Sequence, residues 1–139
     1  MRLSIITISY NSEQTIEETI LSVLNQSNKN IEYIIGDGNS SDNTKSIIEK
    51  YKDKITHFIS EPDNGIYDAM NKGLRMATGD LVGILNSDDV YAYNDVIKDV
   101  VENINNNKTD SLYANLVYVD RNNTEKIRRM WIAGKYKPG

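Results

Sequence analysis

The chain has 139 residues, 39% of them hydrophobic, and carries a formal net charge of -4. This length fits one domain of ordinary size, and the apolar content is enough for one core. The mildly acidic balance argues against a domain that wraps nucleic acid, and the absence of cysteine excludes disulfides, zinc–cysteine sites and cysteine nucleophiles.

Strand and helix patterns alternate along the chain. Strands are predicted over residues 3–8, 31–35, 56–60 and 81–85, and helices over residues 15–26, 44–54, 66–77 and 95–105. A hairpin is predicted from residues 113–120 and 124–130, around the polar pair Asn122 and Asn123. This order predicts an α/β fold with a mostly parallel sheet and helices on both faces, in a single domain over residues 1–139.

Local signals predict where three of the helices begin or end. Thr15 and Glu18 have the spacing of a capping box, in which each side chain satisfies a free backbone amide. Asp42 is suited to cap the second helix, and Gly79 to end the third.

A single histidine and short apolar runs exclude further classes of protein. His57 cannot form a multi-histidine metal site, and a structural place in a strand is its simpler interpretation. The longest apolar runs have five or six residues, whereas a membrane-spanning helix needs about 20. We therefore expect a cytoplasmic location, with membrane contact at most peripheral and belonging to a longer form of the protein.

Polar residues follow every predicted strand. In parallel α/β sheets, ligands bind beyond the carboxyl ends of the strands. Carboxylates follow the strands that end at residues 35, 60 and 85. Because close carboxylates repel one another, a hard divalent cation such as Mg²⁺ or Mn²⁺ would neutralise them. The sequence therefore predicts a metal-assisted site at this edge of the sheet.

The sharpest group is Asn86, Ser87, Asp88 and Asp89, directly after the fourth predicted strand. Carboxylates at the end of a rigid strand can hold Mg²⁺ or Mn²⁺ and leave coordination positions open for phosphate oxygens. An alternative interpretation is that the two acids cap the following turn or helix.

Other candidate residues have both a binding and a structural interpretation. The Tyr10 ring could stack on a nucleobase or pack half-buried. Asp37, beside Gly38, could bind a base or ribose, or form a turn before the next helix. Lys72 could meet a diphosphate or lie on a solvated helix face, and Asp63 is equally open. A dinucleotide fingerprint and a P-loop motif are both absent, which disfavours NAD binding and P-loop chemistry.

Taken in order, these segments resemble the family 2 glycosyltransferases with the GT-A fold, over about residues 1–120. The resemblance is carried by residues 3–11, 17–26, 37–44, 61–73 and 77–89. Residues 3–11 are similar to the family's opening strand and T-Y-N turn, and residues 17–26 to its SVL-x-Q helix. Residues 37–44 are similar to its D-G-S-T-D segment, and residues 61–73 to a stretch of a bacterial surface-polysaccharide subgroup. Residues 77–89 lead to and include the position of the DxD metal motif.

The resemblance implies roles for particular residues. Donor-binding roles fall on Ile8, Ser9, Tyr10, Asp37, Lys72, Ser87, Asp88 and Asp89, and the metal site on Asn86 and Asp88. Tyr10 and Asp37 would contact the nucleoside. Asp88 would hold Mn²⁺ or Mg²⁺ on the donor diphosphate, and Asp89 would bind the sugar or support the metal.

The implied activity is metal-dependent, inverting transfer of a sugar from a nucleotide-sugar, with a UDP-sugar favoured, to a glycan or lipid-linked acceptor. Two positions depart from the family pattern. Gly38 stands where many members have a second acid that contacts uracil, and Asn86 replaces the first acid of the DxD motif.

The family's acceptor-binding part and general base follow the metal motif. We therefore expect this chain to be the N-terminal donor-binding part, truncated after the DxD region and without its base. An alternative is a nucleotide-sugar-binding fragment that transfers nothing. A receiver domain is disfavoured, because Ser9, Tyr10 and Asn11 stand where its acid pair would follow the first strand.

Overall fold

The structure is a computed structural model that describes residues 1–134. Residue contacts divide the chain into a first unit, Met1–Val101, and a second unit, Glu102–Gly139. The first unit contains β1 (Leu3–Ser9), α1 (Ile16–Leu24), β2 (Ile31–Asp37), α2 (Thr44–Glu49), a 3-10 turn η1 (Lys52–Lys54), β3 (His57–Ser60), α3 (Ile66–Met76) and β4 (Leu81–Ile84). Helix α4 (Val96–Asn107) runs from the first unit into the second, which holds β5 (Leu116–Asp120) and β6 (Asn123–Trp131).

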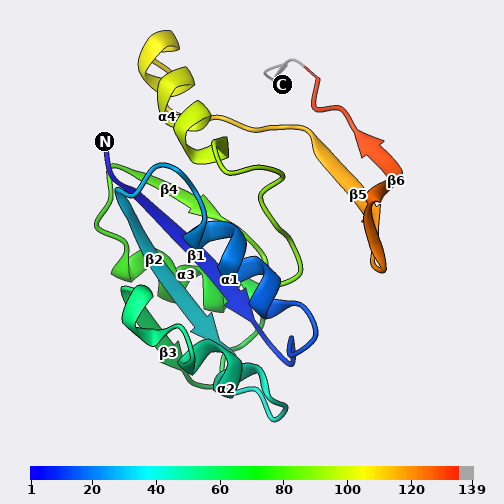
Figure 1. Cartoon of the computed structure of the whole chain (residues 1–139). Coiled ribbons are helices and arrows are strands. Elements are labelled where there is room, and N and C mark those ends of the chain that lie inside the picture. Colours follow the sequence, from blue (N-terminus) through cyan, green and yellow to red (C-terminus); the bar gives the residue numbers. More distant parts are fainter. Residues whose placement is uncertain (135–139) are drawn as a thin grey trace. The chain divides into compact units, whose positions relative to one another are not determined.

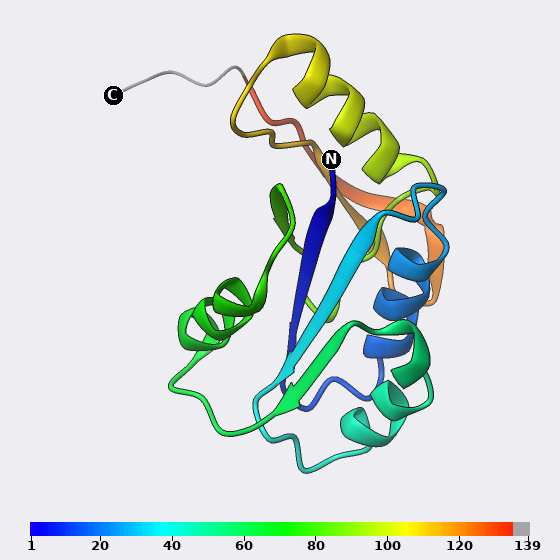
Figure 2. The ribbon, with the colours of Figure 1, turned by 90° about the vertical axis from the view of Figure 1, so that its left-hand side faces the viewer.

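The four strands of the first unit form one parallel sheet in the order β3-β2-β1-β4. Figure 1 shows β1 and β2 at its centre. In Figure 2, α3 covers one face of the sheet, and α1 and α2 cover the other. The predicted parallel sheet with helices on both faces is confirmed.

The central strand β1 separates two apolar layers. Every residue of β1 is buried, as expected for a strand that lies between two helical layers. Leu3 and Ile5 belong to the core cluster with Ile16 and Ile20 of α1. On the other face, Ile6 lies against α3, where it closely approaches Gly73. Burial of each of these apolar side chains stabilises the fold by about 1.5 to 3 kcal/mol, so β1 stabilises the packing of helices on both faces of the sheet.

Two predicted helix starts have different outcomes. The capping box is wrong, because Thr15 stands at the N-cap of α1 without a side-chain cap hydrogen bond. Its φ of -130° and ψ of -30° depart from the extended backbone of a normal N-cap, and its hydroxyl approaches the Ser12 carbonyl at 3.5 Å instead. At α2, the Asp42 carboxylate does accept the Thr44 amide at 3.0 Å, although Asn43 is the N-cap residue.

Two predicted helix ends also differ from the structure. Helix α2 ends at Glu49, and residues 52–54 form η1 instead of a continuation. Helix α3 ends at Met76, before Gly79. Gly79 serves a close approach of two chain segments, because a Cβ there would lie 2.7 Å from the Ser4 amide nitrogen.

In the second unit, β5 and β6 form the predicted antiparallel hairpin, with irregular register after Tyr118. Arg128 binds Asp120 across the hairpin, and the Arg129 guanidinium lies 5.9 Å from the centre of the Trp131 ring. Across the two units, no helix among residues 1–134 is long and apolar enough to cross a membrane.

Candidate functional site

The order of the strands brings several polar loops to one edge. Strand β1 pairs with β2 on one side and with β4 on the other, so the chain reverses its direction of progress across the sheet at β1. Such switch points are where open α/β sheets bind ligands. The loops after β1 and β4 meet here, since the Ser12 and Ser87 hydroxyls are 2.8 Å apart.

A tight turn after β4 presents the predicted metal residues. The Asp89 amide donates to the Asn86 carbonyl at 3.1 Å, and the Asn86 side-chain amide reaches the Asp89 carboxylate at 3.3 Å. Burial and the neighbouring charge of Asp88 raise the pKa of Asp89. Asp88 itself is exposed and is available to a ligand.

The oxygen of the Asn86 side chain is the unusual atom in this turn. Asn86 Oδ1 is buried and has no hydrogen-bond partner within residues 1–134. A buried unpaired oxygen is costly, and a hard cation would satisfy it. No group of three or more His, Asp or Glu side chains suited to a metal occurs in the described part of the chain. Asn86 and Asp88 still fit Mg²⁺ or Mn²⁺, because such ions use few protein carboxylates together with phosphate oxygens.

Asp37 at the end of β2 is the centre of a hydrogen-bond network. Asp37 as a whole is only 3% exposed. It accepts the Ser9 hydroxyl at 3.3 Å, the Ser60 hydroxyl at 2.7 Å, the Ser40 amide at 2.9 Å and also the Ser40 hydroxyl. The network ties together the ends of β1, β2 and β3 and the loop that leads to α2.

At the carboxyl end of β1, two buried residues are followed by an exposed aromatic ring. Ile8 and Ser9 are buried, whereas Tyr10 is 66% exposed. The Tyr10 ring lies beside Gly38 of the next loop, since a Cβ on Gly38 would be 3.3 Å from Tyr10 Cδ2. An exposed aromatic ring at a strand end can stack on a flat ligand.

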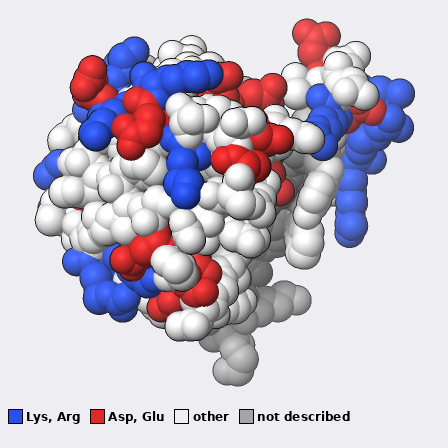
Figure 3. Space-filling view, turned by 90° about the horizontal axis from the view of Figure 1, so that it is seen from below, with Lys and Arg blue, Asp and Glu red and all other residues white. Residues whose placement is uncertain are grey.

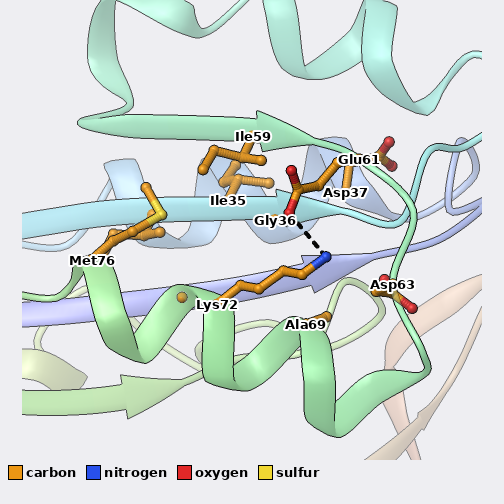
Figure 4. A pocket seen from close by; sticks show the side chains of 11 residues that line it. Ile35, Gly36, Asp37, Ile59, Glu61, Asp63, Ala69, Lys72 and Met76 are labelled. Carbon is orange, nitrogen blue, oxygen red and sulfur yellow. Dashed lines mark ion pairs between the residues drawn. The ribbon is translucent and has the colours of Figure 1, made fainter.

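Lys72 lies apart from the metal turn, in the wall of a pocket between α3 and the sheet. Asp37 and Asp63 line the same pocket. Figure 4 shows Lys72 reaching Glu61, at 2.9 Å. Its ammonium group also donates to the Pro62 carbonyl at 2.8 Å. Lys72 therefore holds the loop between β3 and α3 in place.

The face at the strand ends carries mixed charge. In Figure 3, which looks from below in Figure 1, acidic and basic side chains are interspersed among uncharged ones. The structure thus brings Ser9 and Asp37 together, Tyr10 beside Gly38, and Asn86 to Asp89 into one turn.

Hydroxyl groups are the part of the site that sequence reasoning missed. Ser12, Ser40 and Ser60 each bind a site residue; the first two come from the loops after β1 and β2, and Ser60 ends β3. Serine is common in loops, so its type gave no signal. The asparagine at position 39 did indicate a turn in this loop. The structure gives Asn39 a φ of 61°, which asparagine tolerates better than most residues.

The family model described as Glycosyl transferase family 2 matches residues 4–138. The chain belongs to glycosyl transferase family 2.

Curated relatives agree with this family 2 assignment. The chain is 34% identical over 121 residues to WfgD of Escherichia coli, a UDP-Glc:alpha-D-GlcNAc-diphosphoundecaprenol beta-1,3-glucosyltransferase, which covers 86% of this chain and 47% of WfgD. It is 41% identical over 92 residues to TuaG of Bacillus subtilis, by its name a candidate teichuronic acid biosynthesis glycosyltransferase, over 64% of this chain and 36% of TuaG. The predicted bacterial surface-polysaccharide subgroup is confirmed.

A solved structure confirms the GT-A fold. The family 2 chain is similar to part of the crystal structure of S. aureus TarS 1-349 in complex with UDP-GlcNAc, with a TM-score of 0.73 and 30% identity. The match covers 79% of this chain and 33% of that TarS chain. The chain spans less than half the length of the curated relatives that it matches.

Proposed function

We propose that this family 2 chain binds a nucleotide-sugar and a divalent cation at the strand-end site, and that the protein transfers the sugar to a glycan or lipid-linked acceptor. The observation that carries the proposal is the unpartnered, buried Asn86 Oδ1 beside the exposed Asp88. Two similar proteins support the proposal: the name of WfgD includes UDP-Glc as donor, and the TarS structure is in complex with UDP-GlcNAc.

In this proposal, Ile8, Ser9, Tyr10 and Asp37 form the nucleoside side of the site. Asn86 and Asp88 would hold Mn²⁺ or Mg²⁺, which when bound supplies Lewis-acid neutralisation of the diphosphate charge. The exposed Tyr10 ring would stack on the base, and the Asp37 network would keep this edge rigid.

The remaining predicted residues act around the diphosphate and the sugar. Ser87, fixed by the Ser12 hydroxyl, and Asp89, fixed by the Asn86 amide, would orient the sugar or the metal. Lys72 would contribute by positioning the 61–63 loop. The oxygen of an acceptor hydroxyl would form the new bond at the anomeric carbon with inversion and lose its proton to a general base, while the bond to the diphosphate breaks. We assign no general base within residues 1–134.

The test is calorimetric titration of the chain with UDP, GDP and dTDP, each with and without Mn²⁺. We expect one nucleotide to bind in a metal-dependent way, and Asp88→Ala to weaken that binding by more than about tenfold. Because Asp88 is exposed, the variant should stay folded. Asp53→Ala, which removes an exposed acid in η1, is the matched control and should bind like the wild type. Equal affinities of the wild type and Asp88→Ala in Mn²⁺ would overturn the metal site.

A further inference from the structure

A carboxylate from a distant loop occupies the space beside Gly38. A Cβ built on Gly38 would lie 2.6 Å from Asp63 Oδ2 and 3.3 Å from the Tyr10 ring. Asp63 precedes α3 and Tyr10 follows β1, so two separate loops converge on this glycine. The glycine makes the convergence possible, because any side chain at position 38 would displace one of the two groups.

The Asp63 carboxylate has a hydrogen-bond donor at one oxygen and none at the other among the described residues. Oδ1 accepts the Gly65 amide at 2.9 Å, and Gly65 has a φ of 103°, which a glycine adopts without strain. Oδ2 accepts no hydrogen bond from any residue within 1–134. Lys72 fixes the same loop through Glu61 and the Pro62 carbonyl. Asp63 is therefore a positioned acceptor whose Oδ2 has no hydrogen-bond donor among the described residues. It lies within the field of the Lys72 charge and next to an exposed aromatic ring.

Asp37, another carboxylate that lines this pocket, is in the opposite situation. Both of its oxygens are taken by donors from Ser9, Ser40 and Ser60, and its carboxylate is buried. A ligand could bind the Asp37 carboxylate only by displacing one of these donors, which would leave a buried polar group unpaired. Figure 4 shows Asp63 on the loop beyond the end of β2, where Asp37 lies.

We propose that Asp63 reads the nucleobase of the donor, with Oδ2 accepting a ring N–H while the base stacks on Tyr10. This inference rests on the proposed function, and it gives Asp63 the role that the family resemblance assigns to an acid at position 38. A carboxylate has only acceptors, so it selects bases that offer an N–H at their pairing edge. Uracil, thymine and guanine have one, whereas cytosine presents a bare acceptor nitrogen. The structure thus favours uridine over cytidine donors.

The experiment compares UDP with CDP, which differ at this edge of a ring of the same size. Calorimetric titrations in saturating Mn²⁺ should show that the wild type binds UDP about tenfold to a hundredfold more tightly than CDP. Asp63→Asn has nearly the same shape but can donate to cytosine, so the ratio should fall to near one. Asp53→Asn, a charge-matched change at an exposed acid, should keep the wild-type ratio.

A second variant moves the carboxylate back to position 38. Asp63→Ala should lose the preference for UDP, and adding Gly38→Asp to it should restore the preference. If the wild type binds UDP and CDP equally with Mn²⁺, or if Asp63→Asn keeps the full preference, this inference is overturned while the metal-dependent donor site stands. If no nucleotide binds the wild type with Mn²⁺, both the inference and the proposed function are overturned.

Discussion

Two buried carboxylates on β2 stabilise opposite ends of the same strand. Asp37 lies at its carboxyl end, and Glu32 near its start is only 2% exposed. Each stands beside a serine of β1 in the parallel register, Ser9 and Ser4 respectively. Burying an ionised carboxylate is costly unless hydrogen bonds or opposite charges compensate it. The Asp37 end carries the candidate site, whereas the Glu32 end anchors the fold.

Glu32 joins three segments of the first unit. It accepts the Thr78 amide and the Thr78 hydroxyl, both at 2.7 Å, and the Ser4 hydroxyl, and Arg2 lies 3.6 Å away. Burial alone would raise the pKa of Glu32, but the hydrogen bonds from Ser4 and Thr78 and the charge of Arg2 outweigh it and lower the pKa to about 2. The ionised form is therefore the one that stabilises the folded chain.

Glu32→Gln should destabilise the chain by about 2 to 3 kcal/mol at pH 7, because the neutral side chain lacks the charge that these donors stabilise. The folded-state pKa lies below the unfolded one, so the contribution is complete above about pH 4.5 and is lost as the pH falls toward 2. Urea denaturation at several pH values checks this: between pH 5 and 2, the variant should lose less stability than the wild type. Glu18→Gln, an exposed control, should stay within about 0.5 kcal/mol of the wild type. Parallel stability profiles for Glu32→Gln and the wild type would refute this role.

At the scale of elements, α3 packs tightly against β1 at Gly73. A Cβ at this position would lie 2.5 Å from Ile6 Cγ2, so the glycine lets the helix approach β1. The same helix carries Lys72, which anchors the loop of Asp63. The depth at which α3 packs therefore sets the position of one side of the pocket.

Gly73→Ala should destabilise the chain by about 1 to 3 kcal/mol through overpacking against Ile6, although alanine is the better helix former. Asn71→Ala on the exposed side of the same helix is the control, and should be neutral or slightly stabilising. Thermal and urea unfolding of both variants provide the measurement. A Gly73→Ala chain as stable as Asn71→Ala would show that the helix can shift without cost.

The sequence predicted these elements well where one strong pattern dominated. Residues 5–8 form a continuous β-branched run, and β1 is Leu3–Ser9. It predicted helix ends less well, because Thr15 and Gly79 act through contacts with residues 12 and 4 that local spacing does not reveal. The encounter of Asp63 with Gly38 depends on the packing of two loops that are distant in sequence. The strand order and the serine network around Asp37 depend on tertiary structure in the same way.

At the scale of the whole molecule, the parallel sheet places all four strand ends at one edge. Residues that lie far apart in the sequence, such as Ser12 and Ser87, thereby come within hydrogen-bond distance. This arrangement explains why the predicted donor-binding residues lie at the carboxyl ends of strands or just after them, except for Lys72 of α3. Metal binding at Asn86 and Asp88 is the central claim, because it links the DxD-like turn to donor binding.

The most direct test is a crystal structure of this chain with Mn²⁺ and UDP, with diffraction recorded at the manganese absorption edge. We predict an anomalous peak at coordination distance from Asn86 Oδ1 and the Asp88 carboxylate, with diphosphate oxygens completing the coordination. A structure with UDP bound at the strand ends and manganese elsewhere, or without any manganese peak, would contradict the account.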